Sequence, residues 1–251
     1  MVTEPRAGWP DRSAGSPPVW MDPSFSELLH QHPVLGTIRR YLPPSSASVF
    51  AGRDEIETLP SSYADRGYGL LFYALVRALM PKSCVEIGLF RGYSLLMAAA
   101  ALRDNGAGAI TGYDLFEDYP YRHAQRAQVA QQIVDSGLAA WATLRQADVH
   151  AVHEHWGAVD YLHVDVSNTG ETYRAVFEHW APKVSQVILL EGGSRERDNV
   201  DWMLQYGKPA IVPALADLRR DYPEWSISVL EPFPSLTVAL KTPAVADRAA
   251  S

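Results

Sequence analysis

The spacing of apolar residues divides most of the chain into alternating strands and helices. Short segments of strand length predict strands at residues 83–87, 109–114, 141–148, 161–166 and 187–191, the first of them buried. Between the last two segments, apolar residues recur at i, i+3, i+4 and i+7 from Tyr173 to Trp180, which predicts an amphipathic helix packed on a sheet. Strands that alternate with helices in this way predict a parallel sheet with right-handed crossovers.

The pattern changes near the C-terminus. Two further apolar runs, at residues 225–230 and 236–240, are separated only by residues 231–235, which are too few for a crossover helix. These two runs therefore predict an antiparallel hairpin at one edge of the sheet. The expected fold class is α/β, with a mostly parallel seven-stranded sheet, a C-terminal antiparallel hairpin and helices on both faces.

The N-terminal region has a different character. Residues 1–23 contain five prolines together with glycine and serine, which predicts a flexible leader. Residues 24–62 predict a helical cap, with one or two short helices interrupted near Pro33, and a further helix over residues 67–80 leads into the first strand. We therefore expect a main domain over residues 63–242, followed by a tail at 243–251.

Composition narrows the class of protein. A net charge of −7, with no concentrated basic patch, argues against a nucleic-acid partner. No apolar run approaches 18 residues, and the N-terminus lacks a basic region followed by an apolar core, so we expect a cytoplasmic protein with no membrane partner. Cys84 is the only cysteine, which excludes a disulfide framework and a thiolate metal site.

The strongest candidate site follows the first strand. The chain there turns through Gly88 and Gly92 directly into an apolar helix, so backbone without side chains can approach a ligand at the helix N-terminus. Asp114 ends the next strand, 22 residues beyond Gly92. An acidic residue at this place in nucleotide-binding α/β folds accepts hydrogen bonds from ribose hydroxyls.

Two residues of the turn indicate which ribose-containing ligand it suits. A dinucleotide fingerprint requires glycine where this chain has Phe90, and the carboxylate of Glu86 would repel a phosphate. An NAD-dependent oxidoreductase is therefore disfavoured. A ligand with a ribose, no phosphate and a positive charge fits better.

The pattern Glu86-x-Gly88-x-x-x-Gly92-x-Ser94, followed by Asp114, resembles motifs I and II of the class I S-adenosylmethionine (SAM) dependent methyltransferases. Over residues 63–242 the chain is similar to small-molecule O-methyltransferases of bacterial secondary metabolism, antibiotic biosynthesis included. The resemblance implies a Rossmann-like fold and SAM as cofactor. The cofactor-binding residues expected from it are Tyr63, Arg66, Glu86, Gly88, Phe90, Arg91, Gly92, Ser94, Asp114 and Asp148.

Individual roles follow from the resemblance. Asp114 is expected to bind the ribose, and Glu86 to help hold the methionine part of SAM. Arg66 is expected to clamp the SAM carboxylate or to lie exposed on the surface. Asp148 either contacts adenine or caps the helix after it. For chemistry, the residues named are Asp165, His163 and Glu191, any of which could serve as the base that deprotonates an acceptor.

Metal-dependent O-methyltransferases commonly carry Asp-Gly-Asp-His at the end of the fourth strand, where this chain has residues 165–168, Asp-Val-Ser-Asn. Asp165, Asn168 and Glu191 still offer oxygen ligands of the type that Mg²⁺ accepts. However, Asn168 precedes Glu171 by three residues, as in a capping box that begins a helix. We therefore expect no metal. The polar segment 191–199 is expected to border the acceptor pocket, with Tyr119 and Tyr121 facing it.

The function expected from the resemblance is methyl transfer from SAM to a small-molecule acceptor. Two alternatives stay open. One is SAM-consuming chemistry at the amino-acid chain, either cyclisation or aminocarboxypropyl transfer, which releases methylthioadenosine. The other is a catalytically silent subunit that supports a partner. The oligomeric state is undetermined by the sequence, a homodimer being one option.

Overall fold

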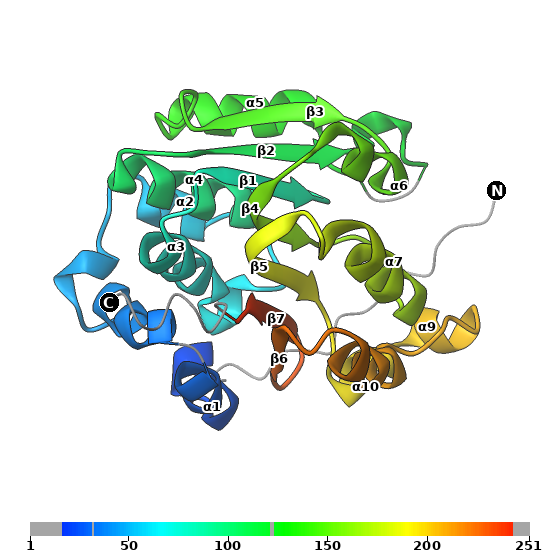
Figure 1. The fold of residues 1–251 in the computed structure, drawn as a ribbon. Helices are drawn as coiled ribbons and strands as arrows, with labels where there is room; N and C mark the ends of the chain where they lie inside the picture. The colour runs from blue at the N-terminus through cyan, green and yellow to red at the C-terminus, as the bar shows by residue number, and fades with distance from the viewer. Residues whose placement is uncertain (1–16, 32, 121–122, 243–251) are drawn as a thin grey trace.

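The computed structural model describes residues 17–31, 33–120 and 123–242. Its centre is a seven-stranded sheet with the order β3-β2-β1-β4-β5-β7-β6 (Figure 1). The strands are β1 (Ser83–Ile87), β2 (Ala109–Asp114), β3 (Ala142–Gln146), β4 (Val159–Val164), β5 (Val184–Glu191), β6 (Trp225–Leu230) and β7 (Leu236–Lys241). The first five pair in parallel, whereas β7 runs antiparallel to both β5 and β6. The fold class predicted from the sequence is therefore confirmed.

Helices cover both faces of this sheet, as the crossover connections require (Figure 1). One face carries α3 (Tyr68–Leu79), α4 (Tyr93–Asn105) and α5 (Arg126–Asp135), whose apolar residues belong to one buried cluster. The other face carries α6 (Val149–Val152), α7 (Gly170–Trp180) and α10 (Ile211–Asp221), which belong to a second cluster. The sheet thus separates two hydrophobic cores.

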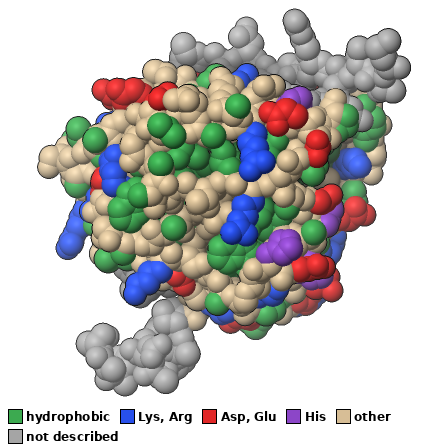
Figure 2. All heavy atoms as spheres, turned by 90° about the horizontal axis from the view of Figure 1, so that it is seen from above, with side chains coloured by type: hydrophobic (Ala, Val, Ile, Leu, Met, Phe, Trp, Pro, Cys, Tyr) green, Lys and Arg blue, Asp and Glu red, His purple; other side chains and the backbone are tan. Residues whose placement is uncertain are grey.

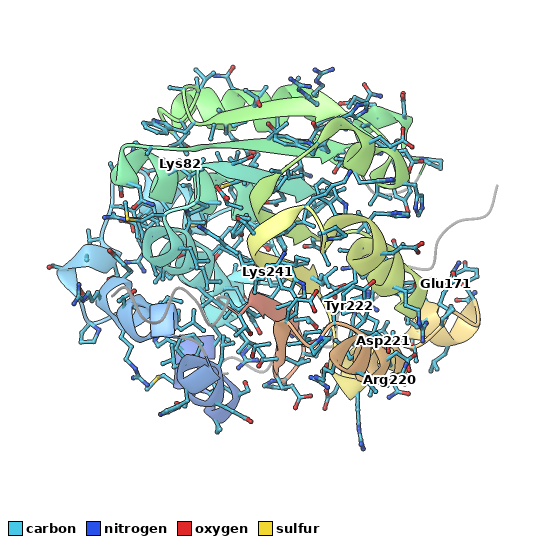
Figure 3. The ribbon with its side chains drawn as sticks, viewed as in Figure 1. Lys82, Glu171, Arg220, Asp221, Tyr222 and Lys241 are labelled. Carbon is cyan, nitrogen blue, oxygen red and sulfur yellow. The ribbon has the colours of Figure 1, made fainter. Side chains whose placement is uncertain are left out.

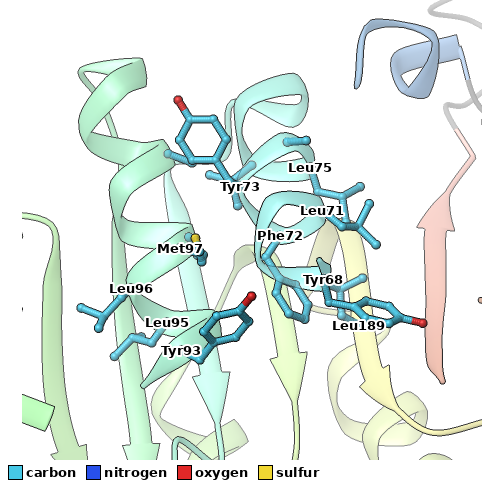
Figure 4. Packing of buried hydrophobic residues seen from close by; sticks show 14 of the residues in the cluster. Tyr68, Leu71, Phe72, Tyr73, Leu75, Tyr93, Leu95, Leu96, Met97 and Leu189 are labelled. Atoms are coloured by element: carbon cyan, nitrogen blue, oxygen red, sulfur yellow. The ribbon is translucent and has the colours of Figure 1, made fainter. Parts of the chain in front are cut away.

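The first core is densest where α3 meets α4 (Figure 4). Phe72 and Leu71 of α3 are fully buried, as is Met97 of α4. Tyr93 begins α4, and its hydroxyl accepts a hydrogen bond from the backbone of Gly69 at 3.2 Å. A Cβ at Gly69 would lie 2.4 Å from that hydroxyl oxygen, so glycine allows the two helices to approach closely.

The region before α3 folds against this same core. It contains α1 (Pro23–Gln31), the 3₁₀ segment Pro33–Tyr41 and α2 (Arg53–Glu57). Phe25 and Leu28 of α1 are buried in the first cluster, as are Leu35 and Ile38 of the 3₁₀ segment. The interruption predicted near Pro33 is thus present. Residues 1–16 of the expected leader and the tail at 243–251 lie outside the described residues.

The structure contains further helices for which the sequence analysis above gives no prediction. α5 begins at Arg126, and α10 begins at Ile211. The segment after β5 forms two short helices, α8 (Arg195–Asp198) and α9 (Asp201–Gln205). β3 ends at Gln146, which places Asp148 outside the strand.

The C-terminal hairpin is tied to the sheet at its end. Lys241, the last residue of β7 (Figure 3), donates hydrogen bonds from Nζ to the carbonyl oxygens of Val184 at 3.0 Å and Ala181 at 3.3 Å. Its ammonium also lies 5.2 Å from the centre of the Trp225 ring. These contacts join β7 to the start of β5 and fix the register of the added strands.

The surface carries mixed charge. On the face seen in Figure 2, Lys and Arg side chains are scattered among acidic, His and apolar side chains instead of forming one basic patch. Within the described ranges, no helix combines the length and the apolar composition needed to cross a membrane.

Candidate active site

A large pocket opens at the carboxyl ends of β1, β4 and β5 and has a volume of about 1000 Å³. The chain order reverses between β1 and β4, and ligands of open α/β sheets bind at such a switch point. Residues that line it include Pro60, Ser61, Tyr63, Asp65, Gly88, Leu89, Phe90, Arg91, Ser94, Asp165, Val166, Ser167, Glu191, Glu196, Arg197, Asn199, Trp202 and Phe233.

The glycine turn after β1 has the predicted bare backbone. Gly88 and Gly92 adopt φ values of 87° and 78°, in the left-handed region that favours glycine. A Cβ at Gly88 would lie 2.0 Å from the carbonyl oxygen of Asp165, so glycine lets the loops after β1 and β4 pass in contact. Phe90, also at positive φ, and Arg91 line the pocket, while Gly92 caps the N-terminus of α4.

Glu86 lies beneath this turn and is fully buried. Ser94 donates a hydrogen bond from Oγ to Glu86 Oε1 at 2.5 Å, and His163 Nδ1 lies 3.5 Å from Glu86 Oε2. Burial alone would lower the pKa of His163, but the adjacent Glu86 outweighs it, so the pKa of His163 is raised. Of these three residues, only Ser94 lines the pocket.

This geometry does not support the prediction that His163 is a general base. Its side chain has no exposed surface, and its ring packs 5.0 Å from the ring of Phe72. An imidazole that is fully buried and absent from the pocket lining cannot reach the proton of an acceptor bound there. His163 instead lies against Glu86 beneath the turn.

The two strand-end acids on the other side of β1 differ from each other. Asp114 is half-buried, and its two carboxylate oxygens accept backbone hydrogen bonds from Leu89 and Phe116, both at 2.8 Å. It therefore fixes the glycine turn against the end of β2. Asp148 is exposed and caps α6 by accepting a hydrogen bond from the backbone of His150 at 2.9 Å. Of the two roles considered for Asp148, helix capping is the one that its contacts support.

Asp165 faces the pocket directly after β4. Burial raises the pKa of Asp165 to about 7, and the negative charge of Glu191 adds to this effect, while His163 and Arg197 oppose it. A carboxyl with a pKa near neutral exchanges protons readily at physiological pH. Of the three residues named for proton transfer, Asp165 thus combines pocket exposure with a suitable pKa.

Glu191 ends β5 and also lines the pocket, but its carboxylate is occupied. Arg197 donates to both oxygens, from Nε at 2.6 Å and from Nη2 at 2.9 Å. Arg197 is 4% exposed, and no pattern in the sequence had distinguished it from the other charged residues of segment 191–199. Because Arg197 binds both carboxylate oxygens, neither is free to take a proton from an acceptor in the pocket.

The capping role predicted for Asn168 is wrong. Thr169 is the N-cap of α7, and its hydroxyl accepts a hydrogen bond from the backbone of Thr172 at 3.3 Å. Asn168 is fully buried, and its amide nitrogen donates to the carbonyl oxygens of Val164 and Glu191, both at 3.0 Å. Asn168 therefore joins the ends of β4 and β5.

Arg66 does not reach the pocket either. Its Nη1 donates to the carbonyl oxygen of Pro232 at 2.8 Å, and its Nη2 pairs with Asp22 at 3.3 Å. The guanidinium joins the β6–β7 loop to the segment before α1. Arg66 is therefore not available as the predicted clamp on the SAM carboxylate. Neighbouring Tyr63 does line the pocket; it is buried, and its hydroxyl has no hydrogen-bond partner in the described part of the chain.

Part of segment 191–199, which was predicted to border the acceptor, lies along the pocket. Its residues Glu196, Arg197 and Asn199 are among the lining residues. Tyr119 is absent from the lining residues, and Tyr121 lies outside the described residues. Phe233, from the β6–β7 loop, supplies an aromatic wall that the sequence reasoning missed.

Comparison with known proteins places this site in a family context. Residues 85–190 match the family model of a methyltransferase domain. A caffeoyl-CoA O-methyltransferase of Stellaria longipes is 27% identical over 180 residues, which cover 70% of each chain. The family model spans the glycine turn, Asp114, Asp148 and Asp165, and ends one residue before Glu191.

Solved structures agree in fold. The O-methyltransferase TomG of Streptomyces achromogenes, solved with SAM, has a TM-score of 0.58 at 17% identity, over 88% of this chain and 96% of its own. An O-methyltransferase of Bacillus cereus, solved with S-adenosylhomocysteine (SAH), has a TM-score of 0.58 at 16% identity, over 82% of this chain and 97% of its own. At these identities the likeness establishes the fold.

Proposed function

We propose that this SAM-dependent methyltransferase, a chain with the class I methyltransferase fold, transfers a methyl group to an oxygen atom of a small molecule. The observation that carries the proposal is the large pocket at the β1/β4 switch point. It brings the glycine turn of motif I and the near-neutral carboxyl of Asp165 into one cavity.

The residues present fit SAM. The ligand supplies an electrophilic methyl group on a positively charged sulfur, and five acidic residues line the pocket: Asp65, Asp165, Glu191, Glu196 and Asp201. The buried hydroxyl of Tyr63, which has no protein partner among the described residues, is a further polar contact available to it. The turn that contains Gly88 and Phe90 would lie along the bound SAM. We assign Asp114, which fixes that turn, to the ribose. A volume of about 1000 Å³ has room for a donor and an acceptor together.

In this proposal the chain itself contributes orientation and one proton transfer. The turn after β1 and the loop after β4 hold donor and acceptor in line, which is the main source of rate in a displacement of this kind. Asp165 takes the proton of the acceptor hydroxyl on its carboxylate. Phe233 and Trp202 enclose the acceptor side and exclude water.

We further propose a role in bacterial secondary metabolism and a cytoplasmic location, with residues 24–62 acting as a helical cap on the domain at 63–242. TomG, which has the same fold, is described as involved in tomaymycin synthesis, and this supports the metabolic assignment. The cap assignment rests on the burial of Phe25 and Leu28 against the core beside α3.

Product analysis tests the proposal. The protein is incubated with SAM and a panel of phenols, alcohols and carboxylic acids, and the nucleosides are separated by chromatography. Methyl transfer leaves SAH, whereas attack on the amino-acid chain leaves methylthioadenosine. Acceptor-dependent SAH formation supports the proposal. Catalytic accumulation of methylthioadenosine without any acceptor, above spontaneous SAM decay, would replace it with the cyclase alternative.

A further inference from the structure

The ion pair between Arg197 and Glu191 lies where the ends of β4 and β5 meet the pocket. The guanidinium of Arg197 donates hydrogen bonds to both carboxylate oxygens of Glu191. Its Nη2 donates a further hydrogen bond to the carbonyl oxygen of Asn168 at 3.2 Å. The plane of the guanidinium is covered by the ring of Trp202, 4.9 Å away. One buried cation is thus bound to the loop after β4, to the end of β5 and to α9.

The acidic residues around this position favour a cation. Asp165 and Glu191 both line the pocket, and the negative charge of Glu191 raises the pKa of Asp165. Arg91 and Arg197 are the cationic residues among the described lining, and Arg91 belongs to the turn after β1, where it donates to Gln128. Arg197 therefore supplies the positive charge that lines the pocket at the β4 and β5 ends, whereas His163, which also acts on Asp165, is absent from the lining.

A divalent metal does not fit this arrangement. Mg²⁺ takes oxygen ligands in near-octahedral geometry, but both carboxylate oxygens of Glu191 are held by Arg197. Within residues 17–31, 33–120 and 123–242, no three His, Cys, Asp or Glu side chains are grouped to hold a metal ion. The oxygens left over are those of Asp165 and Asn168 Oδ1, which is buried without a hydrogen-bond partner.

We propose that Arg197 is a resident cation, which occupies the place between β4 and β5 that a divalent metal takes in metal-dependent O-methyltransferases. Arg197 is a positioning residue: it holds Glu191 and balances the charge beside Asp165, so that the acceptor site works without added metal. The statement that this is an acceptor site rests on the proposed function. The arrangement of charges is tested independently of it by the experiment below.

The proposal predicts that a neutral residue at position 197 converts the site into a metal site. Arg197→Met would free the carboxylate of Glu191 beside Asp165 and the unpartnered Oδ1 of Asn168, which together make a set of oxygen ligands. Arg197→Lys keeps the positive charge and serves as the matched control. The double variant Glu191→Gln/Arg197→Met removes both charges and the central ligand.

Two measurements detect a metal site in Arg197→Met, and neither needs a methyl acceptor. Free Mn²⁺ is titrated by electron paramagnetic resonance, and melting temperatures are measured with and without 10 mM Mg²⁺, an order-of-magnitude excess over typical millimolar sites. Arg197→Met should bind one Mn²⁺ per chain, and Mg²⁺ should raise its melting temperature. The wild type, Arg197→Lys and the double variant should do neither. The melting readout is available even if Arg197→Met is much less stable.

The proposal is overturned if the wild type binds one Mn²⁺ that Glu191→Gln abolishes, or if Arg197→Met gains neither Mn²⁺ binding nor Mg²⁺ stabilisation. Addition of SAH in the same melting experiment keeps the two proposals distinct. A wild type that SAH fails to stabilise would count against the proposed function and leave the result for Arg197 intact.

Discussion

Gly88→Ala should destabilise the protein by about 2–5 kcal/mol, because it forces apart the two loops that form the floor of the pocket. Gly88 has φ of 87°, a conformation that costs a residue with a Cβ about 1–2 kcal/mol. The added Cβ would also lie 2.0 Å from the carbonyl oxygen of Asp165 and 2.7 Å from its carbonyl carbon. Backbone atoms cannot rotate aside, so overpacking of this kind adds about 1–3 kcal/mol.

Gly106→Ala is the matched control. Gly106 has φ of 68° at the end of α4, but a Cβ there would meet nothing within 4 Å. It should therefore cost only the conformational part, about 1–2 kcal/mol. Urea unfolding of the wild type and both variants gives the comparison. Equal destabilisation by the two substitutions would refute the argument that the loops after β1 and β4 are held in direct contact at Gly88.

Two further predictions concern buried charge. Because the pKa of Asp165 is raised from 3.8 to about 7, the folded protein binds more protons than the unfolded chain between these values, and its stability falls as pH rises through that window. In urea unfolding, the free energy of unfolding of the wild type should fall by about 2–3 kcal/mol between pH 5 and 8, and Asp165→Asn should remove this fall. A variant with the same pH profile as the wild type would contradict the raised pKa of Asp165. His163→Gln should cost about 3–5 kcal/mol because it leaves Glu86 buried without a cation. Since the pKa of His163 is raised, this penalty should be full below pH about 6.5 and should shrink as pH rises through the folded-state pKa; a pH-independent penalty would argue for packing alone.

The sequence predicts the sheet because its central strands, β4 and β5, are mostly buried and appear as short segments rich in apolar residues. The hairpin follows from the length of its connection, since the five residues at 231–235 admit no crossover helix. The glycine turn could be predicted because Gly88 has a left-handed backbone conformation and lies against the backbone of Asp165, and both features favour glycine. These features depend on local sequence, so periodicity and turn chemistry are enough to find them.

The features that the sequence could not reveal depend on tertiary contacts. Asn168 and Glu171 have the spacing of a capping box, but the fold buries Asn168 between β4 and β5 and leaves capping to Thr169. Arg197 lies in a segment that has the composition of a solvated loop. The chain turns at residues 192–193, and after this turn the guanidinium of Arg197 binds the carboxylate of Glu191. Similarly, Arg66 is diverted from the pocket by Asp22, which is 44 residues away in the sequence.

The central claim is that the pocket at the end of β1 binds the adenosyl ligand of a methyltransferase, with Asp114 on its ribose. Calorimetric titration of SAH into the wild type and into Asp114→Ala tests it most directly. We expect one SAH site per chain in the wild type, weakened by roughly 1–3 kcal/mol in Asp114→Ala, the scale of a hydrogen bond lost from a charged group. Absence of SAH binding by the folded wild type, together with tight binding of NAD, would contradict it.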